Sequence, residues 1–195
     1  MRLYFVRHGQ SESNLAHVHA GWGDYALTAQ GKEDARQTGR VLKGVSFDKV
    51  YSSDLCRAIQ TQQIALPDAE AERLSILREV NIGPEIMGKS PAECEEKYGD
   101  IYIQGKRRYD FSAIGGESRS EFLARIRSFL KMMEECPYER VAAFCHGGLI
   151  QNALDVVTGM ELGKSDFICS NGSVSVLEYR DGKWRVVCWN VTETL

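Results

Sequence analysis

Short apolar runs alternate with longer amphipathic segments along most of the chain, and this alternation restricts the folds that are open to it. Apolar runs at 3–6, 47–51, 74–77, 140–145, 174–179 and 184–189 are expected to form strands. Segments with the apolar spacing of helices lie between several of them, at 28–42, 54–65, 118–135 and 148–158. The pattern predicts an α/β fold whose sheet is covered by helices on both faces.

Local signals sharpen several of these boundaries. A helix is expected to begin at Ser90, because a proline follows at the first helical position and a glutamate is placed to close a capping box. Ser118 or Ser120 can cap the longest helix. Asp181-Gly182 favours a tight hairpin between the last two strands. The stretch 98–117 shows no clear periodicity and is expected to be one long irregular insertion.

Length and composition narrow the class of protein. The 195 residues suit a single domain spanning 1–195, and 43% hydrophobic with 26% charged residues is ordinary for a globular protein. A net charge of −3 argues against a nucleic-acid partner. No apolar run approaches the ~18–20 residues that a membrane span requires. Since the first strand leaves no room for a secretory segment before it, we expect a cytoplasmic protein.

Metal binding is not expected from the sequence. The six cysteines are scattered without a CxxC pair, so we expect them to be small buried apolar residues in a reducing compartment. His17 and His19 are close together but lack a third ligand of suitable type. We expect these two histidines to rim a pocket or to cap a surface helix.

Residues suited to phosphate chemistry follow the ends of four expected strands. Arg7 and His8 come directly after the first run, Arg57 shortly after the second, Glu79 after the third, and His146 after the run at 140–145. In open α/β sheets the ligand crevice lies at the carboxyl ends of the strands. These five side chains are therefore expected to converge, although they are far apart in the sequence.

Each of these residue types suits one part of phosphoryl transfer. Arg7 and Arg57 can each bind two phosphoryl oxygens through a planar guanidinium. Neutral imidazole is a good nucleophile near pH 7, and we assign this role to His8, because the adjacent Arg7 disfavours the protonated ring. His146 would help to hold the transferring group. Glu79 would act as the general acid and later accept a proton from water.

Further donors to the phosphate are expected near the same strand ends. Asn14 offers a side-chain amide, and the backbone N–H groups around Gly147 lie at the start of an expected helix, where anions bind. No metal ion or organic cofactor is needed for this chemistry.

These motifs resemble those of the histidine phosphatase superfamily, in its phosphoglycerate-mutase-like group, over essentially the whole chain. The resemblance implies a three-layer sandwich with a mostly parallel central sheet. It also implies that His8 is phosphorylated, that Arg7, Arg57 and His146 hold the phosphoryl group, and that Glu79 is the acid. The matching segments are Arg7-His8-Gly9-Gln10-Ser11 with Asn14, Gly21-Trp22-Gly23-Asp24, Leu27-Thr28-Ala29-Gln30-Gly31, Tyr51-Ser52-Ser53-Asp54-Leu55-Cys56-Arg57-Ala58 with Thr61, Leu77-Arg78-Glu79, Gly116-Glu117-Ser118 and His146-Gly147-Gly148.

The same resemblance suggests how a substrate binds. Gly21 is expected to contribute to the substrate site along with Asn14 and Gly147. Lys97-Tyr98-Gly99-Asp100 and the following Lys106-Arg107-Arg108 are similar to the stretch of cofactor-dependent phosphoglycerate mutases that binds substrate acid groups. We therefore assign Arg107 and Arg108 to substrate binding; a solvated charge run is the alternative. If these side chains face the pocket, the substrate carries a second anionic group.

The function expected from the sequence is that of a phosphatase, which hydrolyses a small acidic phosphate monoester through a phosphohistidine on His8. A cofactor-dependent phosphoglycerate mutase is one alternative, although such mutases are generally longer. A non-catalytic protein that binds phosphorylated ligands is another, because Ile86-Met87-Gly88 replaces the family's usual aromatic-acid-glycine after the glutamate. The expected partner is a small-molecule phosphate ester. The sequence leaves open a homodimer.

Overall fold

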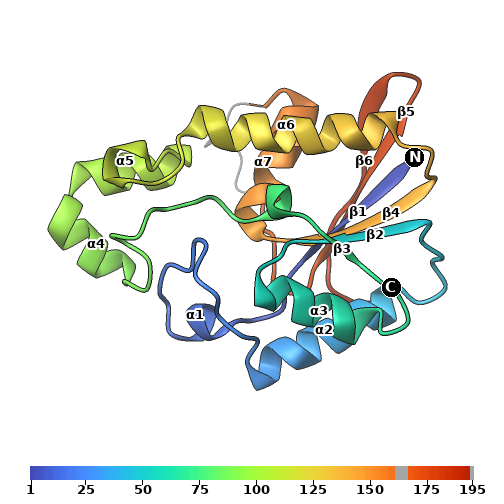
Figure 1. The fold of residues 1–195 in the computed structure, drawn as a ribbon, viewed down its shortest axis with the longest axis horizontal. Helices are drawn as coiled ribbons and strands as arrows, with labels where there is room; N and C mark the ends of the chain where they lie inside the picture. Colours follow the sequence, from blue (N-terminus) through green and yellow to red (C-terminus); the bar gives the residue numbers. More distant parts are fainter. Residues whose placement is uncertain (161–166, 194–195) are drawn as a thin grey trace.

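The computed structural model describes residues 1–160 and 167–193, and its centre is a six-stranded sheet with the order β3-β2-β4-β1-β5-β6 (Figure 1). The first four strands in this order are parallel to one another, whereas β5 and β6 run antiparallel to their neighbours. The strands are β1 Arg2–Arg7, β2 Lys49–Ser52, β3 Glu72–Arg73, β4 Arg140–Cys145, β5 Val174–Arg180 and β6 Lys183–Val191. The mostly parallel sheet expected from the sequence is thus confirmed.

Helices cover both faces of this sheet, as the alternation of elements predicts. Helices α2 and α3 lie on one face, and α6 and α7 lie on the other (Figure 1). Helices α4 and α5 lie on the side of the molecule away from the N-terminus (Figure 1). The helices are α1 Glu12–Leu15, α2 Ala29–Val41, α3 Cys56–Ala65, α4 Pro91–Tyr98, α5 Asp100–Arg108, α6 Arg119–Glu135 and α7 Gly147–Thr158.

Alternating side chains of the central strands supply two cores, one on each face of the sheet. Leu3 and Phe5 of β1 pack in the cluster that includes Phe129 of α6, while Val6 packs in the cluster that includes Ala65 of α3. All of β4 from Val141 to Cys145 is fully buried, as expected for a parallel strand covered on both faces.

The helix starts follow from local chemistry. Ser90 and Ser118 each accept a hydrogen bond from the backbone of the third helical residue, and that residue's glutamate accepts one in return, so both form complete capping boxes. Ser118, not Ser120, is therefore the cap of α6. Asp181 and Gly182 have φ values of 54° and 71°, which are the left-handed angles that a two-residue hairpin turn requires.

Two sequence expectations are wrong. The third strand is the two-residue β3 at Glu72–Arg73, and Ser75–Leu77 forms a 3-10 turn that places Leu77 in the core. The stretch 98–117 is not irregular, since it contains α5 and a 3-10 turn at Ser112–Ile114. The apolar residues Ile101 and Ile103 of α5 are exposed, so its sequence lacks the one-sided apolar stripe by which a surface helix is recognised.

The register of the sheet brings the chemistry-bearing strand ends to one level. Arg7 pairs with Cys145 across the β1–β4 ladder, and the backbone N–H of His8 donates to the carbonyl of Cys145 at 3.1 Å. His8 and His146 therefore leave neighbouring parallel strands side by side. On the other side of β4, the N–H of Ser53 donates to the carbonyl of Phe144 at 2.8 Å. Within the described residues, no helix is long and apolar enough to cross a membrane.

Candidate active site

A pocket of about 280 Å³ lies at the carboxyl ends of the parallel strands. Six of the residues assigned from the sequence line it: Arg7, His8, Asn14, Gly21, Arg57 and Glu79. His146 is fully buried next to His8, with the two ring centroids 5.2 Å apart. The residues expected to meet the phosphate are thus brought together. Gly147, Arg107 and Arg108 are not among the residues that line this pocket, whereas Gly148 and Lys106 are.

His8 is held as a neutral ring with one nitrogen lone pair available. Its Nδ1 lies 2.7 Å from the carbonyl oxygen of Gly9. A carbonyl can only accept, so Nδ1 carries the hydrogen and Nε2 carries the lone pair. Burial holds the pKa of His8 well below its ordinary value of 6.5, and the positive charges of Arg57 and Arg7 lower it further. The ring is therefore unprotonated at neutral pH, as a nucleophile requires.

Two guanidinium groups, from the buried Arg57 and the half-buried Arg7, flank this imidazole. The Nη atoms of Arg57 donate to the carbonyls of Gly23 and Gly21 at 2.8 and 2.9 Å, and Nη1 of Arg7 donates to the carbonyl of Cys169. The Nε atoms of both arginines are buried and have no hydrogen-bond partner among the described residues. Burial lowers the pKa of Arg57, but an arginine so held remains a cation. Each side chain is thus fixed by its outer nitrogens while Nε is left to bind a ligand.

Ser53 determines how the ring of His146 is oriented. The hydroxyl of Ser53 lies 2.9 Å from Nε2 of His146, and both residues are fully buried. Burial holds the pKa of His146 well below 6.5, and the charges around it, Arg57 first, lower it further. Nδ1 of the same ring is buried and has no partner within the described part of the chain. Together with the two arginine Nε atoms, this gives three buried polar nitrogens without a protein partner in one region, which is unusual unless a ligand binds there.

Glu79 is held across the pocket by the backbone. Its two carboxylate oxygens accept hydrogen bonds from the N–H groups of Val80 and Gly148, both at 2.9 Å. Its own carbonyl accepts from Trp22 Nε1 at 2.7 Å and from Arg125 Nη2 at 3.2 Å. The carboxylate is therefore positioned over the start of α7, the helix that follows His146.

A buried ion pair supports the loop that carries Glu79. Arg125 of α6 pairs with Glu117 at 2.9 Å, and these side chains are only 15% and 11% exposed. Glu117 also accepts the backbone N–H of Asn81 at 3.1 Å. The Gly116-Glu117-Ser118 motif of the sequence thus acts on the site indirectly, through the path of the chain on both sides of Val80.

Sequence reasoning missed three residues that support the site, namely Ser53 in this role, Arg125 and Asn171. The side-chain amide of Asn171 donates to the carbonyl of His8 at 3.1 Å and to Oδ1 of Asn14 at 3.2 Å. A signal for Asn171 was available. Because β5 is antiparallel to its neighbour, the residues just before it lie at the same end of the sheet as the residues just after β1.

The other end of the pocket is formed by the loop before Gly21 and by α5. Val18, His19, Ile82, Lys106 and Phe111 line it. His19 thus rims the pocket, while His17 is exposed. In residues 1–160 and 167–193, no three His, Cys, Asp or Glu side chains come together in a group that could hold a metal ion.

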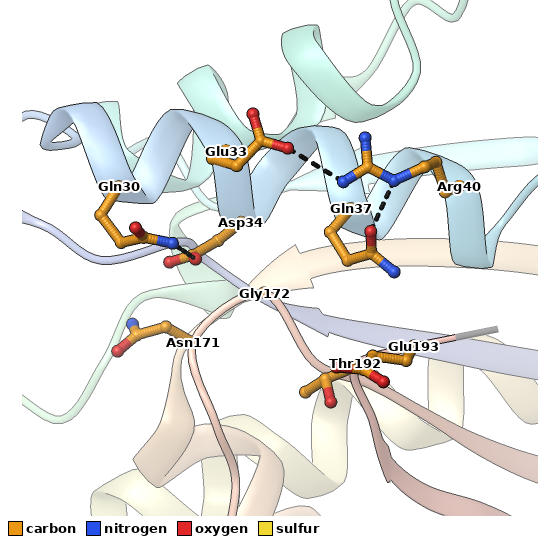
Figure 2. A pocket seen from close by; sticks show the side chains of 9 residues that line it. All are labelled: Gln30, Glu33, Asp34, Gln37, Arg40, Asn171, Gly172, Thr192 and Glu193. Carbon is orange, nitrogen blue, oxygen red and sulfur yellow. Dashed lines mark hydrogen bonds and ion pairs between the residues drawn. The ribbon is translucent and has the colours of Figure 1, made fainter. Parts of the chain in front are cut away.

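A second hollow of about 480 Å³ lies along α2, and it is polar (Figure 2). Its side chains largely satisfy one another. Glu33 pairs with Arg40 at 2.9 Å, and Asp34 accepts from Gln30 at 2.9 Å and from the backbone of Gln10 at 2.9 Å. None of the residues assigned to phosphate chemistry lines this hollow, so it offers no comparable site.

The first pocket can therefore bind a phosphate group and react with it. Two guanidinium cations can neutralise the equatorial oxygens, a neutral imidazole nitrogen can attack phosphorus, and a carboxylate in the same pocket can transfer a proton. No other described pocket combines these groups.

Comparisons with known proteins agree with this geometry. The family model of the histidine phosphatase superfamily (branch 1) matches residues 3–192. A 2,3-bisphosphoglycerate-dependent phosphoglycerate mutase from Methylocella silvestris is 39% identical over 132 residues, which is 64% of this chain and 64% of that protein, a little under two thirds of its length. A protein of the same description from Parvibaculum lavamentivorans is 34% identical over 161 residues, covering 77% of this chain and 76% of that one.

Solved structures match over almost the full length. A putative α-ribazole-5′-P phosphatase from Escherichia coli superposes with a TM-score of 0.88 at 25% identity, covering 99% of this chain and 97% of that one. A phosphoserine phosphatase variant from Entamoeba histolytica, in complex with phosphoserine, superposes with a TM-score of 0.84 at 25% identity, covering 98% and 97%. With the family model matching nearly every residue, the chain belongs to the histidine phosphatase superfamily.

Proposed function

We propose that this protein is a phosphatase that hydrolyses a small acidic phosphate monoester through a phosphohistidine on His8. The observation that carries the proposal is the cluster of His8, Arg7, Arg57 and His146, in which three buried nitrogens have no partner among residues 1–160 and 167–193 and lie beside a neutral imidazole. Such a cluster suits a dianionic group, because the guanidinium cations offset its charge and their N–H groups bind its oxygens.

The reaction divides into two in-line displacements. In the first, Nε2 of His8 attacks phosphorus, the bond from phosphorus to the ester oxygen breaks, and Glu79 gives its proton to the leaving oxygen. In the second, water attacks the phosphohistidine, Glu79 takes a proton from that water, and the bond between phosphorus and Nε2 breaks. Inorganic phosphate leaves, and His8 and Glu79 return to their starting states. Arg7, Arg57 and His146 hold the phosphoryl oxygens throughout both steps.

A phosphoglycerate mutase is the second candidate, and the curated relatives favour it, since the two described above carry that name. A mutase uses the same phosphohistidine but returns the phosphoryl group to the product. One feature favours hydrolysis instead. The solved phosphatases match this chain over 97% or more of both lengths, whereas the first mutase matches over 64%.

The deciding experiment measures the fate of the phosphoryl group. The protein is incubated with sugar phosphates, phosphoglycerates and nucleotide-derived monophosphates, and the release of free phosphate is measured. With radiolabelled phosphate esters, rapid quench traps the acid-labile phosphoryl label on His8. The expected result is release of phosphate with label on the wild type and none on His8→Ala, while His17→Asn, at an exposed histidine, keeps both. Rapid isomerisation of 3-phosphoglycerate with catalytic bisphosphoglycerate and without free phosphate would establish the mutase instead. Equal, negligible rates for wild type and His8→Ala would favour a phospho-ligand-binding protein.

A further inference from the structure

From two further side chains that line the pocket of His8, we infer that Lys106 and His19 bind the second anionic group of the substrate, a carboxylate or a second phosphate. The inference rests on the proposed function, and it assigns substrate selection to Lys106 in place of Arg107 and Arg108.

The rotation of α5 decides which basic residue meets the pocket. Lys106 lines the pocket, whereas the next two residues on the same helix do not. Successive helical residues point about 100° apart, so consecutive basic residues cannot share one direction. Of the described residues that line the pocket, the cationic ones are Arg7, Arg57 and Lys106, and the only carboxylate is Glu79. The two arginines are assigned to the phosphoryl group, which leaves Lys106 as the pocket cation available to a second anionic group.

A buried tyrosine gives His19, next to Lys106 in the pocket lining, a defined hydrogen-bonding role. The hydroxyl of Tyr102 lies 2.6 Å from Nε2 of His19, and Tyr102 is fully buried. Burial raises the pKa of Tyr102 to about 12, so the hydroxyl keeps its hydrogen at neutral pH. Within the described residues, the hydrogen-bond partner of this hydroxyl is His19, and a buried hydroxyl hydrogen without an acceptor would be costly. We therefore assign the hydroxyl as the donor and Nε2 as the acceptor, which places the ring hydrogen of His19 on Nδ1, where it can donate to a ligand.

Lys106 and His19 lie close to the same side chain, the ring of Tyr102. Lys106 Nζ lies 5.8 Å from the centre of the Tyr102 ring, on which His19 also packs edge to face. Burial lowers the pKa of His19, and the charge of Lys106 lowers it further, as expected for a cation close to the ring. A cation beside a neutral N–H donor is a site for an anion and repels an ammonium group. Val18, Ile82 and Phe111 line the same pocket and leave room for a short carbon chain.

Two substrates of equal size separate this role from phosphate binding. 3-Phosphoglycerate and glycerol 3-phosphate differ only in a carboxylate against a hydroxymethyl group, and 1,3-propanediol bisphosphate tests a second phosphate. Because Lys106 is exposed, its contribution is that of a partly screened ion pair. Lys106→Met is expected to lower kcat/KM for the acidic substrates about fivefold at low salt, mainly through KM, and for glycerol 3-phosphate less than twofold. The matched control Arg107→Met should change none of them.

Tyr102→Phe tests the histidine separately. Without the hydroxyl, His19 is free to place its hydrogen on either nitrogen, so discrimination between 3-phosphoglycerate and glycerol 3-phosphate should narrow while activity on glycerol 3-phosphate is kept. Thermal melting of each variant checks that the fold is intact. Whichever acidic substrate loses more in Lys106→Met identifies the anion as a carboxylate or a phosphate.

Two results would overturn the inference. One is an equal loss for all three substrates in Lys106→Met; the other is an equal effect of Arg107→Met and Lys106→Met. Calorimetric binding of the same compounds to His8→Ala separates this inference from the proposed function. Absence of turnover in the wild type, with binding that still prefers 3-phosphoglycerate and loses this preference in Lys106→Met, would refute the phosphatase while supporting the anion site.

Discussion

Replacing Glu79 by glutamine is the sharpest test of the proton-transfer step. The change keeps the shape of the side chain and removes its ability to deliver a proton. Both carboxylate oxygens accept backbone N–H groups, from Val80 and Gly148, each at 2.9 Å. Glutamine offers a single acceptor oxygen, so one of these N–H groups faces an amide NH₂ instead.

Two free-energy effects follow, and they differ in how they depend on the substrate. The lost backbone hydrogen bond to a charged group costs about 1.5–3 kcal/mol, and it affects the enzyme in the same way whichever ester is bound. The lost proton donor costs a factor of about 10²–10⁴, or about 3–5 kcal/mol in the barrier, but only for leaving groups that need protonation. An alkoxide needs this proton, whereas p-nitrophenolate is stable without it. The ratio of the two rates therefore isolates the acid role.

The assay compares kcat/KM for an alkyl phosphate and for p-nitrophenyl phosphate in wild type and Glu79→Gln. The alkyl substrate is expected to lose about 100-fold or more relative to p-nitrophenyl phosphate. Glu85→Gln is the matched control, because Glu85 is an exposed carboxylate that pairs with Lys97 at 3.0 Å, away from the pocket. Losses of similar size on both substrates would remove Glu79 from the acid role and leave it a positioning residue only.

Four further predictions test the electrostatics, the packing and the metal independence of the site. Because His8 and His146 have lowered pKa values in the folded state, the unfolded chain binds more protons below pH ~6.5. The contribution of these two groups to the free energy of unfolding should be constant above that pH and should fall below it, by at most about 2.7 kcal/mol per pH unit. Urea denaturation that shows no such fall would contradict their neutral burial. A methyl group at Gly31 would lie 1.9 Å from the backbone carbonyl oxygen of Gln10, in the loop after β1. Gly31→Ala should therefore lower the free energy of unfolding by about 3 kcal/mol, although alanine otherwise favours a helix. A variant that chemical denaturation shows to be stabilised would refute the close packing. A methyl group at Gly148 would lie 2.4 Å from Oε1 of Glu79, so Gly148→Ala should lower kcat on alkyl phosphates about 100-fold, and unchanged kinetics would show that Glu79 can move without loss of activity. The activity of the wild type should persist in EDTA. A loss of activity that a divalent ion restores would contradict the arginine-based mechanism.

Much of the fold could be predicted because its signals are local. Capping residues, apolar periodicity and the Asp181-Gly182 turn depend on neighbours within a few positions, and these predicted the helices α6 and α7 and the final hairpin. The convergence of His8, Arg57, Glu79 and His146 at one edge also followed from the sequence, because parallel strands must present their carboxyl ends together. The structure does bring these residues to one pocket and its immediate wall.

The errors occurred where tertiary contacts override local pattern. The stretch after β2 was expected to be a strand at 74–77, but burial of Leu77 in the core is achieved by a 3-10 turn. Helix α5 was missed because it buries only a narrow side, with Tyr102 and Gly105 inward and Ile101 outward. Tyr102 packs against His19, which lies more than eighty positions earlier in the sequence, so no local window contains this contact.

What the sequence by itself determined is the set of reactive groups and the edge of the sheet where they meet, since alternating strands and helices predict a parallel sheet whose carboxyl ends lie together. What only the tertiary structure decided is which group faces which. The rotation of α5 selects Lys106 over Arg107, the hydroxyl of Ser53 orients His146, and Asn171 reaches His8 from the turn before the antiparallel strand β5. The physical reason is that a side chain's direction depends on the packing of its whole element against the rest of the molecule, whereas its chemical type is written at its own position in the chain.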